Sequence, residues 1–175
     1  MFVIVHLIFL FQCRSITSLN QNLSFKAISA DNQIIGVVLC REILRDVNGF
    51  PTYNNIRLKH IAGLLEEAGH KYGTIWDHVP PEVDRVGLIC IVSVAKECQG
   101  LGIASQLLQA AKNKLRLHFR AALIECSNPN MARSSQKTMV HMATVPFNEY
   151  KDSDEGVVFD ADSPENSLNL YYEIF

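Results

Sequence analysis

The sequence has no marked excess of either charge and no cysteine spacing typical of a metal site. Its 16 basic residues, against 18 acidic ones, give a formal net charge of −2, which argues against a nucleic-acid-binding surface or a polybasic membrane patch. The five cysteines form no CxxC pair and no CxxC/HxxxH pattern, so we expect no zinc or other metal site. Because their number is odd and their spacing irregular, they indicate reduced thiols in a cytoplasmic protein.

Long hydrophobic runs, internal repeats and low-complexity linkers are also scarce. At 175 residues the chain fits one domain with a sizeable core. One apolar run, Phe2–Phe11, has the length of a signal-peptide core and is too short to span a bilayer. We interpret it as a buried first strand or an atypical start to the chain, with a secretory signal or membrane anchor as the alternative. The predicted division is an atypical segment and loop at residues 1–22 and one domain at residues 23–175.

The remaining pattern alternates between strands and helices. Leu23–Ser29 and Ile34–Leu39 flank a polar turn and predict an antiparallel hairpin. Asn55–Gly69 predicts a helix that ends at Gly69. The residues expected on its buried face are Ile56, Ile61, Leu64, Leu65 and Ala68. Later expectations are a short helix at Ser134–Ala143 and strands at Phe147–Asp152, Gly156–Phe159 and Ser167–Phe175.

Two apolar strands flank a helix in the middle of the chain. Val86–Val94 is nearly continuously apolar, which is typical of burial on both faces, and Ala121–Cys126 has the same character. Between them a helix is expected from Leu101 to about Leu117, with inward residues Ile103, Leu107, Leu108, Ala111 and Leu115. Together they predict a right-handed βαβ unit. The expected fold class is therefore α/β, a mixed α+β sheet with helices on its faces.

The turn before this helix carries glycine at positions 100 and 102. Glycine lets the backbone approach a bulky anion, and unpaired amides with the helix dipole favour phosphate at the helix start. A tight turn without a ligand is the plainer interpretation. A dinucleotide fingerprint would need a third glycine where Ser105 stands, and too little chain follows for the remaining βαβ repeats. A P-loop is excluded because no GK[ST] follows.

Gln99-x-x-Gly102-x-Ala104 matches the Q/R-x-x-G-x-G/A signature of the GNAT acyltransferases, between a strand and a helix as in that superfamily. Phe147–Asp152 and Val157–Phe159 resemble the tail of the invertebrate arylalkylamine N-acetyltransferases. The resemblance covers roughly Leu23 to Phe175. It implies the GNAT acyl-CoA N-acyltransferase fold, with its N-terminal helical part incomplete.

The resemblance also implies where acetyl-CoA binds as co-substrate. The diphosphate would rest on amides of the glycine turn, and Ser105 would add a hydroxyl. The pantetheine arm would pair with the free edge of the strand before the turn, like an added strand. A backbone N–H near Val94 would stabilise the oxyanion. The residues implied to contact the coenzyme are Val92, Ser93, Val94, Gln99, Gly100, Leu101, Gly102, Ile103, Ala104 and Ser105.

For catalysis, the resemblance implies direct attack by a primary amine on the thioester. An alkylammonium has a pKa near 10, by analogy with lysine, so it must first lose a proton to a base. In the related enzymes this base is a glutamate in a segment resembling FxxDEPL, which the residues before Leu23 do not contain. Serines after the second strand are also implicated, and Ser127 and Ser135 (or Ser134) occupy comparable places.

The predicted function is transfer of acetyl from acetyl-CoA to a small arylalkylamine. The alternatives are a polyamine or protein amine as acceptor, a catalytically silent CoA-binding protein, and, more distantly, a dinucleotide-binding protein. We expect His60 and His70 on a helix surface and His78 in a solvated loop. Tyrosines 150, 171 and 172 are expected in core packing, with an acceptor pocket as the other interpretation.

Overall fold

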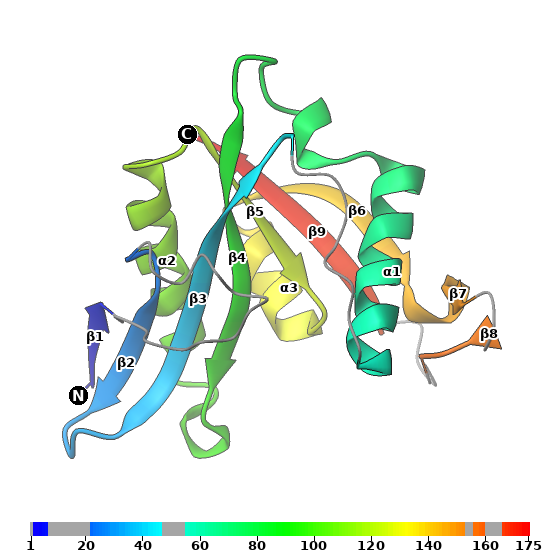
Figure 1. Cartoon of the computed structure of the whole chain (residues 1–175). Coiled ribbons are helices and arrows are strands. Elements are labelled where there is room, and N and C mark those ends of the chain that lie inside the picture. Colours follow the sequence, from blue (N-terminus) through cyan, green and yellow to red (C-terminus); the bar gives the residue numbers. More distant parts are fainter. Residues whose placement is uncertain (1, 7–21, 47–54, 153–155, 160–165) are drawn as a thin grey trace. The chain divides into compact units, whose positions relative to one another are not determined.

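The computed structural model describes residues 2–6, 22–46, 55–152, 156–159 and 166–175 (Figure 1). The chain divides into two compact units. Unit 1 comprises Met1–Leu44, Arg85–Ile124 and Ile174–Phe175, and unit 2 comprises Arg45–Asp84 and Glu125–Glu173. The predicted boundary between residues 22 and 23 stays a prediction.

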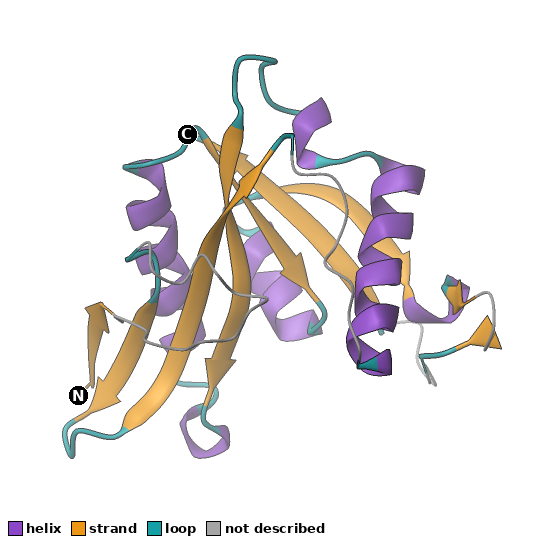
Figure 2. Cartoon of the chain, viewed as in Figure 1, coloured by secondary structure: helices purple, strands orange, loops and turns teal. Residues whose placement is uncertain are grey.

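Unit 1 is built on a mixed sheet (Figure 2). Its strands, in spatial order, are β1 (Phe2–His6), β2 (Phe25–Ser29), β3 (Ile34–Leu44), β4 (Arg85–Val94) and β5 (Ala121–Cys126). Neighbours are antiparallel from β1 to β4, whereas β4 and β5 are parallel. The predicted hairpin and the parallel pair are therefore confirmed, and so is a first strand at Phe2–His6. Residues 7–11, the rest of the apolar run, lie outside the described part.

Helix α2 (Ile103–Arg116) packs on one face of this sheet. All five residues predicted to point inward are buried, and Lys112 is buried beside them. Glycines on the sheet allow the close packing. A Cβ on Gly87 of β4 would lie 2.7 Å from Leu115 Cδ2, and one on Gly36 of β3 would lie 3.0 Å from Leu107 Cδ1. The amphipathic pattern of α2 thus predicts its buried face correctly.

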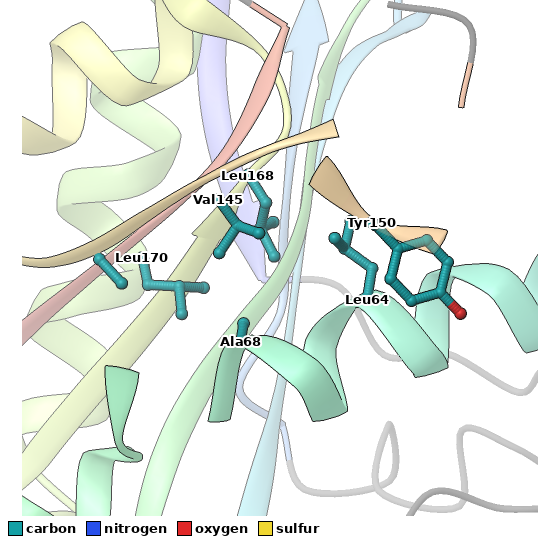
Figure 3. Packing of buried hydrophobic residues seen from close by; sticks show 7 residues of the cluster. Leu64, Ala68, Val145, Tyr150, Leu168 and Leu170 are labelled. Atoms are coloured by element: carbon teal, nitrogen blue, oxygen red, sulfur yellow. The ribbon is translucent and has the colours of Figure 1, made fainter. Parts of the chain in front are cut away.

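Unit 2 has its core between α1 and an antiparallel pair of strands. The elements are α1 (Ile56–Tyr72), α3 (Pro129–Gln136), β6 (Val140–Pro146), β9 (Ser167–Ile174) and a two-stranded hairpin of β7 (Lys151–Asp152) with β8 (Gly156–Val157). Figure 3 shows the core cluster, in which side chains of α1 face those of β6 and β9. Its buried members are Leu64, Ala68, Ala143, Val145, Tyr150, Leu168 and Leu170.

The prediction for α1 was wrong in its end and partly in its buried face. The helix passes Gly69 and ends at Tyr72, where Gly73 adopts φ +82° and its N–H donates to Gly69 O at 3.0 Å. A left-handed glycine after the last turn is the usual helix stop, and here Gly73, not Gly69, supplies it. Ile56 and Ile61 are each 46% exposed, whereas His60 is buried. His60, Leu64 and Ala68 recur every four residues, so they share one face of the helix.

The predicted helix at Ser134–Ala143 was also wrong. The helix begins earlier, because Asn128 Oδ1 accepts a hydrogen bond from the Asn130 N–H at 2.8 Å and Pro129 occupies the first turn. Asparagine as N-cap followed by proline is a strong start signal that resembles a loop in sequence. Residues 140–143 belong to β6, which therefore contains His141.

The expected strand at Phe147–Asp152 is shorter than predicted. Phe147–Glu149 form a 3-10 turn, and only Lys151–Asp152 pair as β7. The strand predicted at Gly156–Phe159 is reduced to Gly156–Val157, while the last strand closely matches its prediction. Among the residues described, no helix combines the length and apolar character that a membrane crossing requires.

Candidate functional site

The turn between β4 and α2 carries two glycines in the left-handed region. Gly100 has φ +79° and Gly102 has φ +75°, and a Cβ at either position would meet no atom within 4 Å. Glycine is therefore favoured here by the left-handed backbone conformation. It is not favoured by steric crowding around the Cβ position. The result is a turn whose main chain is open to solvent, since residues 99–102 are all exposed.

The start of α2 has no side-chain cap. Gly102 is the N-cap, and its carbonyl accepts the first helical hydrogen bond from the Gln106 N–H at 3.1 Å. In an α-helix the amides of the first turn have no intrahelical acceptor, and no acidic residue stands in this turn. The amides and the positive end of the helix dipole therefore point to one place, which suits an anion.

Two contacts anchor the turn. The Ile103 side chain is 1% exposed and inserts into the core of unit 1. The Gln99 side-chain amide donates to Val94 O at 3.3 Å, which ties the turn to the last residue of β4. A short 3-10 helix, Lys96–Cys98, lies between Val94 and Gln99 and reverses the chain. The glycine turn is thus held at both ends. The Gln99 N–H donates to Lys96 O at 3.3 Å, so the amides that can face an anion begin at Gly100.

Strand β4 has a bulge in the middle. Leu39 of β3 pairs with Ile91 and Cys40 with Ile89, so Cys90 is the extra residue. The parallel register with β5 covers Gly87–Ile89 against Ala122–Ile124. The bulge therefore coincides with the last β4–β5 pair. A bulge bends its strand and interrupts the ladder, which accounts for the end of the pairing at this point.

Beyond the bulge, β4 has a different environment. In the described registers, residues 91–94 pair with β3, and the register between β4 and β5 ends at Ile89. The edge of residues 91–94 that faces away from β3 is therefore not paired with β5 in that register. Predicted burial on both faces holds for Val86–Ile89 and was wrong for the rest, where half-buried and exposed residues alternate and Ile91 is 46% exposed. An edge of this kind accepts an extended chain by strand-like hydrogen bonding. The bulge was not predictable, since an apolar run carries no mark of it.

The two predicted serines have contrasting environments in unit 2. Ser127 is exposed and directly follows β5. Ser135 of α3 is 0% exposed, and its Oγ lies 3.4 Å from Cys126 Sγ. Burial raises the pKa of the Cys126 thiol to about 11, against a smaller lowering by the Ser135 hydroxyl. Ser134, the other candidate, lies within α3.

The aromatic residues mostly serve packing. Tyr150 and Tyr171 are 6% and 4% exposed, so the expectation of core packing is confirmed for both. Tyr172 stacks on the exposed His78, with centroids 4.6 Å apart and planes 23° apart.

His70 is exposed as expected. The expected surface position of His60 was wrong: it is buried, with Nε2 3.9 Å from the buried Asp152 carboxylate. Its spacing of four residues from Leu64 was the signal for this.

No group of three or more His, Cys, Asp or Glu side chains in the described part of the chain is arranged to hold a metal ion.

Comparison with known proteins adds the family and the fold. The sequence profile of the acetyltransferase (GNAT) family matches residues 9–133. No curated protein matches the chain in sequence. The chain resembles the structure of mosquito arylalkylamine N-acetyltransferase like 5b, with a TM-score of 0.78 and 16% identity, over 93% of this chain and 79% of that one.

Two further solved structures are similar. Arylalkylamine N-acetyltransferase 2 from Aedes aegypti has a TM-score of 0.73 and 22% identity, over 92% of this chain and 77% of that one. Drosophila melanogaster polyamine N-acetyltransferase, which forms N-acetylagmatine, has a TM-score of 0.73 and 14% identity, over 93% and 79% of the two chains. At these identities the likeness concerns the fold.

Proposed function

Because this chain belongs to the acetyltransferase (GNAT) family, we propose that it transfers an acetyl group from acetyl-CoA to a small primary amine of the arylalkylamine class. Members of the family use acetyl-CoA. The observation that carries the proposal is the pair of left-handed glycines, Gly100 and Gly102, in front of an uncapped helix start. This arrangement suits a diphosphate, which needs several amide donors and close backbone approach.

The residues present fit the coenzyme. The open turn lacks any Cβ at its two glycines and any carboxylate in the first turn of α2. In the proposal, amides of residues 100–104 and the Ser105 hydroxyl hold the diphosphate. The Gln99 N–H donates to Lys96 O at 3.3 Å, so Gln99 contributes by anchoring the turn. The pantetheine arm takes the backbone edge of Val92, Ser93 and Val94, which precede the turn. This edge is not paired with β5 in the described register. Acetyl-CoA supplies the acetyl thioester, and the chain supplies binding and orientation.

The chemistry requires a neutral amine, an oxyanion donor and a proton for the departing thiolate. The proposed oxyanion donor is a backbone N–H near Val94, at the end of the open edge. Of the two serines, Ser127 is exposed, so it is the one we propose for a role in the reaction. Ser135 is completely buried on Cys126, so its proposed role is to position the end of β5.

The acceptor class is supported by the tail of the chain. Phe147–Asp152 and Val157–Phe159 resemble the corresponding segment of arylalkylamine N-acetyltransferases. The solved structures of similar fold include enzymes named for arylalkylamines, agmatine and polyamines. An arylalkylamine is therefore the first acceptor to test, and a polyamine is the second.

Calorimetry with acetyl-CoA and release of free CoA thiol in the presence of tyramine, dopamine or spermidine test the proposal. We expect acetyl-CoA binding and faster turnover with the two arylalkylamines. A preference for spermidine would support acetyl transfer with a polyamine as the acceptor in place of an arylalkylamine. Coenzyme binding without turnover on any amine would identify a silent CoA-binding protein. No heat with acetyl-CoA or CoA would overturn the proposal.

A further inference from the structure

The bulge of β4 brings two cysteines into opposition. Ile89 and Cys90 both stand against Cys40 of β3, because a bulge sets two residues of one strand against one of the other. Cys40 is 0% exposed, and Cys90 is half-buried. Both residues belong to unit 1, and neither is part of a disulfide in the structure. The Cys40 thiol is therefore shielded from solvent, whereas the Cys90 thiol is partly accessible.

The expected separation suits a disulfide. Residues opposite each other in an antiparallel pair have Cα atoms about 4.5–5.5 Å apart, inside the range of about 4.4–6.8 Å found for disulfides. Burial raises the pKa of the Cys40 thiol, and the nearby Cys90 thiol raises it further. This electrostatic effect of Cys90 on Cys40 agrees with the register in placing the two cysteines near each other.

We infer that Cys40 and Cys90 form a redox-active thiol pair that takes a small-molecule disulfide as oxidant and closes a disulfide bond between β3 and β4. Cys90 directly follows Ile89, the last residue of β4 in the described register with β5. A second part of the inference rests on the proposed function. The arm of bound acetyl-CoA would lie along this edge of β4, so acetyl-CoA protects the two thiols from oxidation.

The reaction proceeds in two exchanges. The Cys90 thiol loses a proton, and its thiolate attacks one sulfur of an R–S–S–R disulfide. A mixed disulfide forms and R–S⁻ leaves, taking up a proton. Cys40 then loses its proton and attacks Cys90 Sγ, and the second R–S⁻ leaves and is protonated. The two protein thiols are oxidised and the small disulfide is reduced to two thiols.

The order of the two exchanges follows from the exposure and the acidity of the two thiols. Cys90 reacts first because it is half-buried, whereas Cys40 is fully buried. The raised pKa of Cys40 leaves little thiolate at neutral pH, so the second exchange is the slow one. A mixed disulfide on Cys90 should therefore accumulate before the internal bond forms.

The first test treats the full chain with oxidised glutathione, blocks remaining thiols and maps the cysteines by mass spectrometry without reduction. We expect a glutathione adduct on Cys90 first, then a peptide pair joined through Cys40 and Cys90. Cys40→Ser should stop at the adduct. Cys98→Ser removes another half-buried thiol of unit 1 and should behave like the unaltered chain. A Cys40 that stays alkylatable after complete oxidation, or a bond to another cysteine, would overturn the inference, and this readout needs no variant to fold.

The second test separates the thiol pair from coenzyme binding. Acetyl-CoA, without an amine, is added at ten times its calorimetric Kd, which should slow adduct formation on Cys90 about tenfold by mass action. Binding without protection would remove the coenzyme link from the inference. Disulfide formation in a chain that binds no acetyl-CoA would overturn the proposed function and leave the thiol pair standing.

Discussion

The hydroxyl of Tyr150 lies directly over Gly63 of α1, where a Cβ on residue 63 would overlap it. Figure 3 shows the Tyr150 ring beside Leu64, the next residue of the helix. Glycine inside a helix costs about 0.5–1 kcal/mol relative to alanine, so the close approach of the ring is the physical reason for glycine here. Burial, and then the carboxylates of Asp152, Glu67 and Glu66, raise the pKa of this hydroxyl.

Gly63→Ala should destabilise the protein by about 1–2 kcal/mol, because overpacking against Tyr150 outweighs the gain in helix propensity. Gly69→Ala is the matched control in the same helix. Its Cβ would meet Thr74 Cγ2 at an ordinary 3.5 Å, so it should stabilise by about 0.5–1 kcal/mol. Urea unfolding measures both. Adding Tyr150→Phe to Gly63→Ala should recover part of the loss, and strict additivity of the two changes would contradict this account.

Gly102→Asp should weaken coenzyme binding, because a carboxylate would stand beside the diphosphate at the start of α2. Gly102→Asn has nearly the same shape and tolerates the left-handed backbone equally well, so it controls for strain. We expect a Kd roughly tenfold or more higher for the aspartate variant than for the asparagine variant, a difference of about 1.4 kcal/mol or more.

Calorimetry at low and high salt checks this prediction. The difference between the two variants should shrink as ionic strength rises, since screening weakens the repulsion. Their melting temperatures should agree, because a Cβ at this position meets no other atom within 4 Å. Equal Kd values in two folded variants would place the diphosphate elsewhere.

Ser127→Ala and Ser135→Ala should separate an exposed role from a buried one. Ser135 is fully buried and hydrogen-bonded with Cys126, so its loss should cost about 1 kcal/mol in denaturant unfolding. Ser127 is exposed, and its loss should change stability by less than about 0.5 kcal/mol. If Ser127 handles a proton, kcat for the best amine should fall roughly 10²-fold with little change in melting temperature. Full activity of Ser127→Ala would remove it from the reaction.

Stability should fall as the pH rises from about 9 to about 11. Burial raises the pKa of Cys126 from its ordinary 9.0 to about 11. In this window the unfolded chain has released the thiol proton and the folded chain still holds it, so the free energy of unfolding decreases by up to about 1.4 kcal/mol per pH unit. The buried Cys40 thiol, with its pKa raised further, adds to the same slope. Guanidinium unfolding of the parent chain and Cys126→Ala should give the variant the shallower slope, and equal slopes would contradict the burial argument.

Several parts of the fold were predictable because local pattern and tertiary burial agree there. The inward residues of α2 recur at helical spacing, and its face meets a sheet that is apolar at that side. The bounds of β5 are those of its apolar run. The glycine turn was predictable for a local reason too, since the left-handed backbone at Gly100 and Gly102 restricts the residue type directly.

Other parts depended on which partners the chain meets. In α1, Ile61 and His60 are neighbours in sequence, yet the helix face that meets β6 and β9 includes the histidine and leaves the isoleucine half exposed. Hydropathy alone favoured the opposite assignment, because it does not contain the direction from which the strands approach. The bulge that sets Cys90 against Cys40 is a property of the register between two strands. The amino-acid order thus determined the glycine turn and the helix behind it. The open edge of β4 and the facing thiols were decided by strand pairing, which joins residues far apart along the chain.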